Sequence, residues 1–133
     1  MNELNEVVKH FCTAALFTEV DELDNPLGDN YSVESIAPES MRCITANIAQ
    51  WLVDNKALTD QLTDTFGANL IGYNLWLTSQ GHGVGFGDRD LDELGDQLTR
   101  VCEYRHDLFS NGLYVGDDGQ LYFSGCEAIK EQQ

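Results

Sequence analysis

The N-terminal part of the chain carries apolar residues with the period of an α-helix. Over residues 3–20 they recur three and four positions apart, which places them on one helix face. Residues 38–55 repeat this spacing, and Pro38 and Glu39 suit a first helical turn. We therefore predict two amphipathic helices. Their apolar faces are Leu4, Val7, Val8, Phe11, Cys12, Ala15 and Leu16 in the first, and Met41, Ile44, Ile48, Trp51 and Leu52 in the second.

The middle of the chain changes period. Residues 21–35 are rich in Asp, Asn, Gly and Pro, which predicts an acidic loop between the two helices. Large apolar residues spaced by four predict a third helix over residues 57–71, with Gly72 as its C-terminal cap. From Tyr73 to Thr78 apolar and other residues alternate, and glycines follow, so residues 73–86 are predicted to form a β-hairpin.

The C-terminal third predicts one more helix and one more hairpin. Residues 88–105 have helical spacing, and Asp88 can cap the helix start. Two short apolar runs flank Asp117-Asp118-Gly119, a turn sequence that favours a hairpin over residues 113–123. We expect a single α+β domain, residues 1–133, with four helices packed on a small antiparallel sheet made of two β-hairpins.

The composition adds a strong negative charge to this picture. The chain has 133 residues, with 7 Lys and Arg against 23 Asp and Glu, a net charge of −16. Such a charge repels phosphate backbones and anionic lipid surfaces, so neither direct nucleic-acid binding nor membrane binding is expected. Most of the charge lies in two blocks: residues 1–40 have 1 basic and 9 acidic residues, and residues 88–118 have 3 and 9.

The second acidic block offers a candidate partner-binding face. On a helix, Asp92 and Asp96 would be neighbours one turn apart, and Glu103 would continue the same side. Together with Asp88, they could present carboxylates at spacings that resemble successive phosphates, and so occupy the basic groove of a nucleic-acid-binding partner. Trp76 could add an apolar contact if it lies on the outer strand face. The alternative is that the acidity only keeps the protein soluble.

A glycine-rich segment, residues 81–89, is the other candidate site. Its His82, Asp88 and Arg89 could form a small ligand pocket, with His82 as a general base. The glycines match neither a dinucleotide fingerprint nor a Walker loop, and Asp88, Asp90 and Asp92 lack the glycine of a calcium loop. No catalytic residue, metal site or cofactor is therefore assigned.

The cysteines and the hydropathy suggest a reducing compartment. The four cysteines, Cys12, Cys43, Cys102 and Cys126, contain no Cys-x-x-Cys pair, so we expect buried free thiols rather than a zinc or redox site. No run of 18 apolar residues and no basic-apolar leader is present. We expect a soluble protein of the cytoplasm.

Several segments between residues 26 and 123 form a distinctive pattern: Pro26–Val33, Ile36–Glu39, Leu75–Thr78, Gly81–Arg89, Leu94–Thr99 and Leu113–Gly119. In these segments the chain resembles a widespread, uncharacterised family of small acidic bacteriophage and prophage proteins. Its most specific pieces are Gly-His-Gly and Asp-Asp-Gly. Gly87 departs from the pattern, because that family often carries Trp there.

The resemblance implies a phage accessory protein and supplies no established activity. Proteins of this size and origin often bind and inhibit host factors, including restriction and CRISPR complexes. We therefore expect a non-enzymatic protein that binds a host protein with a basic surface. The alternative is a small enzyme or ligand-binding domain centred on the Gly-His-Gly segment. The sequence does not specify the oligomeric state.

Overall fold

The computed structural model describes residues 2–21, 23–62, 68–80, 93–103, 105–110 and 112–124. The described chain is mostly helical with a small antiparallel sheet, which confirms the α+β class. The longer helices are α1 (Asn2–Thr18), α2 (Pro38–Asp54), α4 (Ala68–Ser79) and α5 (Glu93–Arg100). The shorter elements are α3 (Lys56–Thr59), α6 (His106–Phe109), the 3₁₀ turns η1 (Leu27–Asp29), η2 (Val33–Ser35) and η3 (Asp60–Leu62), and strands β1 (Leu113–Val115) and β2 (Leu121–Phe123).

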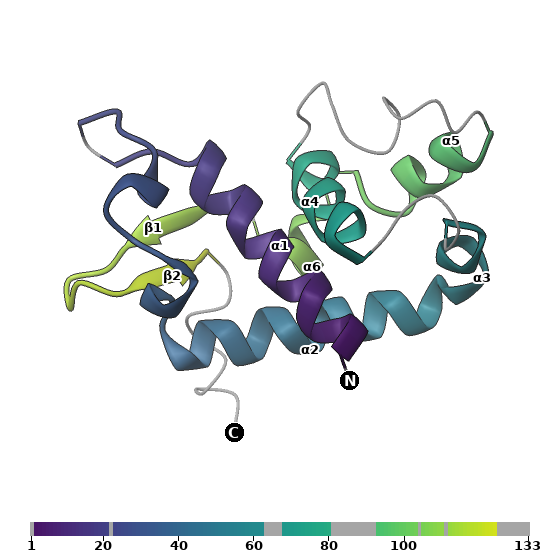
Figure 1. Cartoon of the computed structure of the whole chain (residues 1–133), viewed down its shortest axis with the longest axis horizontal. Coiled ribbons are helices and arrows are strands. Elements are labelled where there is room, and N and C mark those ends of the chain that lie inside the picture. The colour runs from purple at the N-terminus through teal and green to yellow at the C-terminus, as the bar shows by residue number, and fades with distance from the viewer. Residues whose placement is uncertain are drawn as a thin grey trace.

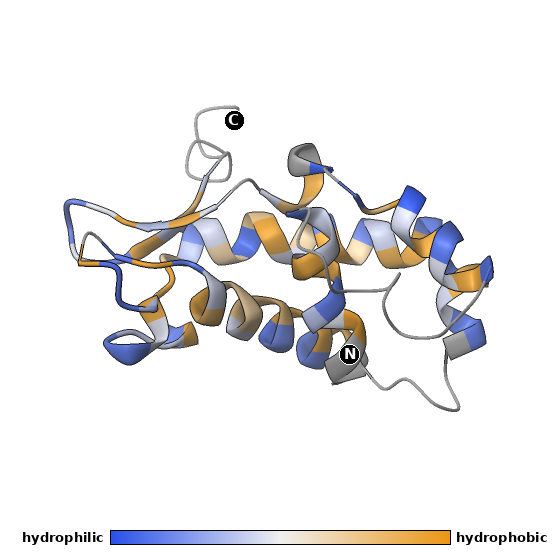
Figure 2. Cartoon of the chain, turned by 90° about the horizontal axis from the view of Figure 1, so that it is seen from above, coloured by the Kyte–Doolittle hydropathy of each residue, from blue (hydrophilic) through white to orange (hydrophobic). Residues whose placement is uncertain are grey.

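The first two predicted helices are confirmed. Helix α1 buries the predicted apolar face except Leu4, which is half-buried, and α2 begins with Pro38 in its first turn. Their buried apolar residues belong to one hydrophobic core, which α4 shares. Hydrophobic and hydrophilic colours alternate along the helices (Figure 2). The sheet lies at one end of α2, whereas α3 and α5 lie at the other (Figure 1). The molecule is therefore elongated along α2.

Helix α4 corrects the predicted first hairpin. Residues 73–78 are helical, not extended, and Gly72 lies inside α4 rather than at a helix end. The reason is that α4 is central: nearly every residue from Ile71 to Ser79 is buried, including polar Asn74, Thr78 and Ser79. A helix buried on all sides has no polar face, so its sequence need not show a helical period. Residues 81–86 of the predicted hairpin lie outside the described residues.

The predicted third and fourth helices are recognisable with different bounds. Of residues 57–71, the described parts form α3, η3 and the start of α4, in place of one continuous helix. The helix predicted over 88–105 is α5, and a turn over residues 101–103 follows it. This turn keeps a helical hydrogen bond, because the N–H of Glu103 donates to the carbonyl of Thr99 at 2.7 Å. Residues 88–92 lie outside the described residues.

The C-terminal hairpin is confirmed. Strands β1 and β2 are antiparallel and pair Leu113 with Phe123, Tyr114 with Tyr122 and Val115 with Leu121. Gly119 has a φ of 83°, the left-handed conformation that a tight hairpin turn requires and that glycine adopts without strain. The outer edge of β2 is occupied: Ala37 N–H donates to the Leu121 carbonyl at 2.8 Å. The sheet is thus anchored to the start of α2.

Candidate functional site

Two of the predicted partner-binding carboxylates can be placed. Asp96 on α5 and Glu103 in the turn after it are both exposed, on a helix whose opposite side buries Leu98. Glu93, in the first turn of α5, is exposed as well. Acidic side chains at a helix N-terminus are stabilised by the helix dipole. The α5 end therefore presents carboxylates to solvent.

The other two predicted carboxylates, Asp88 and Asp92, lie outside the described residues. The same is true of His82 and Arg89, the remaining members of the predicted ligand pocket. Within the described part of the chain, no group of three or more His, Cys, Asp and Glu side chains is arranged to hold a metal ion.

The described acidic residues gather at two ends of the molecule. The loop after α1, which carries Glu19, Asp21, Asp24 and Asp29, lies at the sheet end of the molecule, and α5 lies at the opposite end (Figure 1). The sequence left open whether the two blocks form one face. The described carboxylates of the second block are divided: Glu93, Asp96 and Glu103 lie at the α5 end, whereas Asp117 and Asp118 lie in the turn between β1 and β2 at the sheet end.

Trp76 is not a surface residue, which corrects its assignment as a partner contact. Its exposed fraction is 0%, and its indole Nε1 donates a hydrogen bond to Thr18 Oγ1 at 2.7 Å. The ring meets Phe11 edge-on, with 5.4 Å between the ring centroids. The assignment failed because it placed Trp76 on the outer face of a strand, whereas α4 is a central helix.

The cysteines divide into two kinds. Cys12 and Cys102 are buried free thiols, as expected, and burial raises the pKa of Cys12 to about 12 and that of Cys102 as well. Cys43 is disulfide-bonded, so the expectation of a free thiol there is wrong. Its partner lies outside the described residues. Sequence spacing could not reveal this bond, because pairing depends on how the fold brings distant cysteines together.

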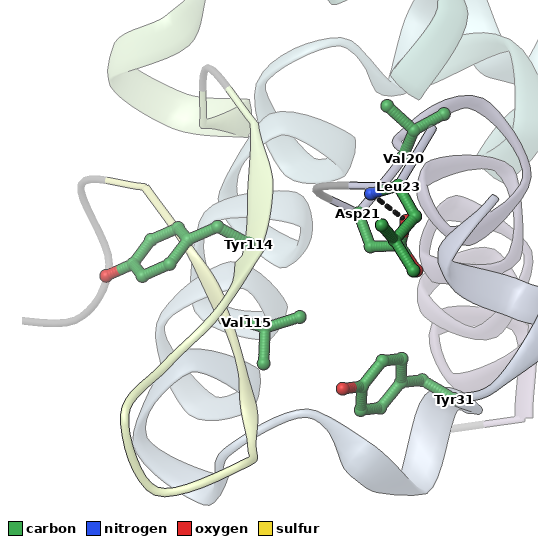
Figure 3. A pocket seen from close by; sticks show the side chains of 6 residues that line it. All are labelled: Val20, Asp21, Leu23, Tyr31, Tyr114 and Val115. Atoms are coloured by element: carbon green, nitrogen blue, oxygen red, sulfur yellow. Dashed lines mark hydrogen bonds between the residues drawn. The ribbon is translucent and has the colours of Figure 1, made fainter. Parts of the chain in front are cut away.

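A pocket at the sheet end is the candidate site that the sequence reading missed. Its volume is about 580 Å³, within the range of ligand-binding pockets. We call it the hairpin groove and define it by its lining residues: Val20, Asp21, Leu23, Tyr31, Tyr114 and Val115. The acidic loop forms one wall and β1 the other, and Val115 points across it toward Tyr31 (Figure 3).

The groove exposes an unusual amount of apolar surface. Leu23 is 78% exposed, Val20 50%, Tyr114 41% and Val115 37%, and these four are among the few large hydrophobic residues that the described chain exposes. Single exposed apolar residues are normal, but a cluster around a concavity is typical of an interaction site. The signal available in the sequence was Val20 and Leu23, two apolar residues within a loop that is otherwise acidic and polar.

The loop wall is held in shape by Asp21. Its carboxylate oxygen Oδ1 accepts hydrogen bonds from the N–H groups of Leu23 at 2.8 Å and Asn25 at 3.0 Å. Val20 and Pro26 form a β-bridge that closes the loop, and Asp24 adopts a left-handed φ of 67°. Asp tolerates this conformation better than most residues. The exposed side chain of Leu23 is therefore presented by a hydrogen-bonded loop.

At the base of the groove, Glu19 contacts the outer edge of β1. Burial raises the pKa of its half-buried carboxyl, and a hydrogen bond from the backbone of Leu113 opposes this by favouring the charged form. At the far end of the hairpin, Tyr122 donates its hydroxyl to Asp118 at 2.5 Å. This bond lowers the pKa of Asp118 and raises that of Tyr122 to about 12.

No protein-family model, curated protein or solved structure matches the chain. Among the described residues, no helix is both long and apolar enough to span a membrane.

Proposed function

We propose that the chain is a non-enzymatic phage accessory protein that binds and inhibits a host protein with a basic surface. The acidic surface carries this proposal. The proposed phage origin of the protein rests on the resemblance of the segments between residues 26 and 123 to small acidic phage proteins. A nucleic-acid-binding defence complex, such as a restriction or CRISPR nuclease, is the class of target whose basic groove best complements this charge.

The distribution of exposed charge supports this proposal. Eleven Asp and Glu residues are exposed among those described, against four Lys and Arg. The acidic ones are Glu6, Asp24, Asp29, Glu34, Asp54, Asp60, Glu93, Asp96, Glu103, Asp117 and Asp118; the basic ones are Lys9, Arg42, Lys56 and Arg100. Only one Lys–carboxylate ion pair is recorded within the described residues, between Lys56 and Asp60 at 2.9 Å. Most of the exposed acidity is thus available for a cationic partner.

The first experiment is capture of host proteins from bacterial lysate on the immobilised chain, at low and at high ionic strength. Attraction between exposed charges is screened by salt, so the captured complex should weaken steeply as salt rises. A complex that is indifferent to ionic strength would contradict recognition through charge.

Two double variants of equal charge change locate the contact. Asp96→Asn with Glu103→Gln removes two negative charges from the α5 end, and Asp24→Asn with Asp29→Asn removes two from the loop end. If the α5 end contacts the partner, as the spacing of its carboxylates favours, the first variant should lose about tenfold or more in affinity, and the second should lose less. Equal losses would indicate that only the total charge matters, and would contradict a specific site on α5.

The alternative, an enzyme or ligand-binding domain around His82, Asp88 and Arg89, depends on residues outside the described part of the chain. No observation among the described residues favours it, and the proposal above does not use it.

A further inference from the structure

Strand β1 has an outer edge with room beside it. The sheet has two strands, and the pairing pattern decides where each main-chain group points. Gly116 N–H donates to the Gln120 carbonyl, and Ser124 N–H donates to the Gly112 carbonyl. In an antiparallel pair, residues alternate between those that bond to the partner strand and those that point outward. Leu113 and Val115 on β1, and their partners on β2, are therefore the outward-pointing residues.

The two outer edges of the sheet differ in how far their main-chain groups are hydrogen-bonded. On β2 the Leu121 carbonyl accepts from Ala37 N–H, and Phe123 N–H donates to Ser40 Oγ at 3.0 Å, so that edge is satisfied by the protein. On β1 the backbone of Leu113 bonds to the Glu19 carboxylate. Among the described residues, no partner is recorded for the outward N–H and carbonyl of Val115. This open position of the edge belongs to a residue that lines the hairpin groove.

The groove beside this edge suits a bound segment whose side chains alternate between apolar and basic. Val20, Leu23 and Val115 expose apolar surface into it, and Asp21 adds a carboxylate. When an extended segment adds to a sheet edge, main-chain hydrogen bonds supply affinity and pockets for alternate side chains supply specificity. The hairpin groove combines both elements.

The charge of the two walls decides which kind of segment fits. The sequence over residues 19–31 contains five Asp and Glu, and that over residues 112–124 contains two. Neither stretch contains Lys or Arg. A second copy of this chain would bring the same carboxylates against these walls, and like charges at close range are unfavourable. A cationic segment is complementary.

We propose that the hairpin groove binds an extended segment of a partner protein, with alternating basic and apolar side chains, as an added strand beside Val115 of β1. The inference rests on the proposed function only in requiring a partner with basic residues. It assigns the contact to the sheet end, and so is independent of the carboxylates on α5.

The test uses a synthetic peptide of alternating Lys and Val as the probe, followed by NMR of the labelled full chain. Titration should shift the amide signals of Leu23 and Val115, and hydrogen exchange of the Val115 amide should slow when its N–H becomes bonded. Two control peptides keep the charge: one groups all Val before all Lys, and the other carries N-methyl groups on alternate main-chain nitrogens. The N-methylated peptide should bind about tenfold more weakly, the loss expected for one or two hydrogen bonds. The grouped peptide keeps its main-chain donors and should bind more weakly because its side chains no longer alternate.

Variants of the chain test the same contact from the other side. Val115→Pro removes the outward N–H and leaves the β1–β2 bonds in place, since proline is tolerated on an edge strand. It should weaken the alternating peptide about tenfold. Val115→Thr keeps the N–H and should weaken it less. Leu23→Ser changes only an exposed loop residue and should also weaken binding, which keeps the test valid if the proline variant unfolds. Asp54→Asn, which removes an exposed carboxylate at the end of α2 that is remote from the sheet, should leave binding unchanged.

Each outcome decides the proposal. If the N-methylated peptide bound as tightly as the alternating peptide, charge attraction alone would explain binding and strand addition would be overturned. NMR shifts confined to the α5 end would overturn it as well. Self-association of the chain in sedimentation experiments, abolished by Val115→Pro, would assign the groove to a second copy and overturn the partner proposal. If the peptide binds at the groove but lysate capture is independent of salt, the proposed function fails and strand addition stands. If lysate capture weakens with salt but the peptide does not bind at the groove, strand addition fails and the proposed function stands.

Discussion

The Cα of Gly72 on α4 lies directly against the main chain of Val7 on α1. A Cβ at this position would be 2.1 Å from the Val7 carbonyl oxygen and 2.9 Å from the Phe11 nitrogen. Real Cβ atoms do not approach backbone atoms this closely, so only glycine fits. The absence of a side chain lets α1 and α4 pack at backbone contact, which brings Phe11 and Trp76 together in the core.

We expect Gly72→Ala to destabilise the protein strongly. The added methyl group meets backbone rather than a flexible side chain, so the two helices must move apart. Overpacking of a core costs about 1–3 kcal/mol, and a clash with backbone belongs at the upper end. Urea unfolding measures the loss of free energy of unfolding. The matched control is Gly28→Ala, whose Cβ would find its nearest atom, the Leu16 carbonyl oxygen, at 3.5 Å. A control loss as large as that of Gly72→Ala would contradict the explanation.

Gly72 also shows where sequence reading reaches its limit. Helices α1 and α2 each have one solvent-exposed face, and they could be predicted because burial on one side imposes a helical period on the apolar residues. The C-terminal hairpin was predicted because its turn needs a residue with positive φ, which Gly119 supplies. The sequence predicts a strand within α4 because this helix is buried on all sides and shows no helical period. It predicts a helix end at Gly72, whose actual role is a contact with α1, and a local pattern cannot reveal a contact with a residue as far along the chain as Val7.

The same limit applies to the candidate site: local features could be predicted, and contacts between distant segments could not. Asp96 and Glu103 could be predicted as exposed carboxylates because charged side chains on a helix face solvent. The hairpin groove could not, since it joins residues 20–31 to β1, two segments separated by most of the chain. The open edge at Val115 depends on pairing register as well, which becomes visible only when both strands are placed.

The burial of Trp76 predicts a specific fluorescence result. In a Trp51→Phe variant, Trp76 is the single tryptophan. Because Trp76 is 0% exposed, its emission should be blue-shifted relative to the unfolded chain and hardly quenched by acrylamide. Urea should red-shift the emission and restore quenching. Efficient quenching of the folded variant would contradict the central position of Trp76 and reopen its assignment as a surface contact.

The hydrogen bond between Ser40 on α2 and Phe123 on β2 is expected to stabilise the folded protein. Ser40 is fully buried, and its Oγ accepts the Phe123 N–H at 3.0 Å. Ser40→Ala leaves that buried N–H without a partner, which costs about 1–3 kcal/mol of unfolding free energy. Thr13→Ala is the control, because Thr13 is exposed and its hydroxyl bonds only within α1. We expect the control to change stability by less than about 0.5 kcal/mol. Equal effects in urea unfolding would argue against the buried bond.

The pair Asp118 and Tyr122 predicts opposite pH effects at the two ends of the scale. Its hydrogen bond lowers the pKa of Asp118, so the stabilisation that it gives the hairpin is present above the ordinary Asp pKa of about 3.9 and is lost as the pH falls through the lowered value. The pKa of Tyr122 is raised to about 12, so the same stabilisation is complete below the ordinary Tyr pKa of about 10 and is lost as the pH rises toward the raised value.

Tyr122→Phe separates these effects from the general acidity of the chain. Without the hydroxyl, the pKa of Asp118 should rise toward that of an ordinary aspartate, which carboxyl carbon NMR can follow during an acid titration. Asp118→Asn should conversely lower the pKa of Tyr122, measured by phenolate absorbance. Tyr114→Phe is the control, because Tyr114 stacks on the Tyr122 ring with centroids 6.0 Å apart and its replacement keeps the Tyr122 hydroxyl. A pKa of Asp118 that is the same in the wild type and in Tyr122→Phe would mean that the hydrogen bond does not set it. The lowering would then have to come from the backbone hydrogen bonds to this carboxylate, which the N–H groups of Gln120, at 3.0 Å, and of Asp118 itself donate.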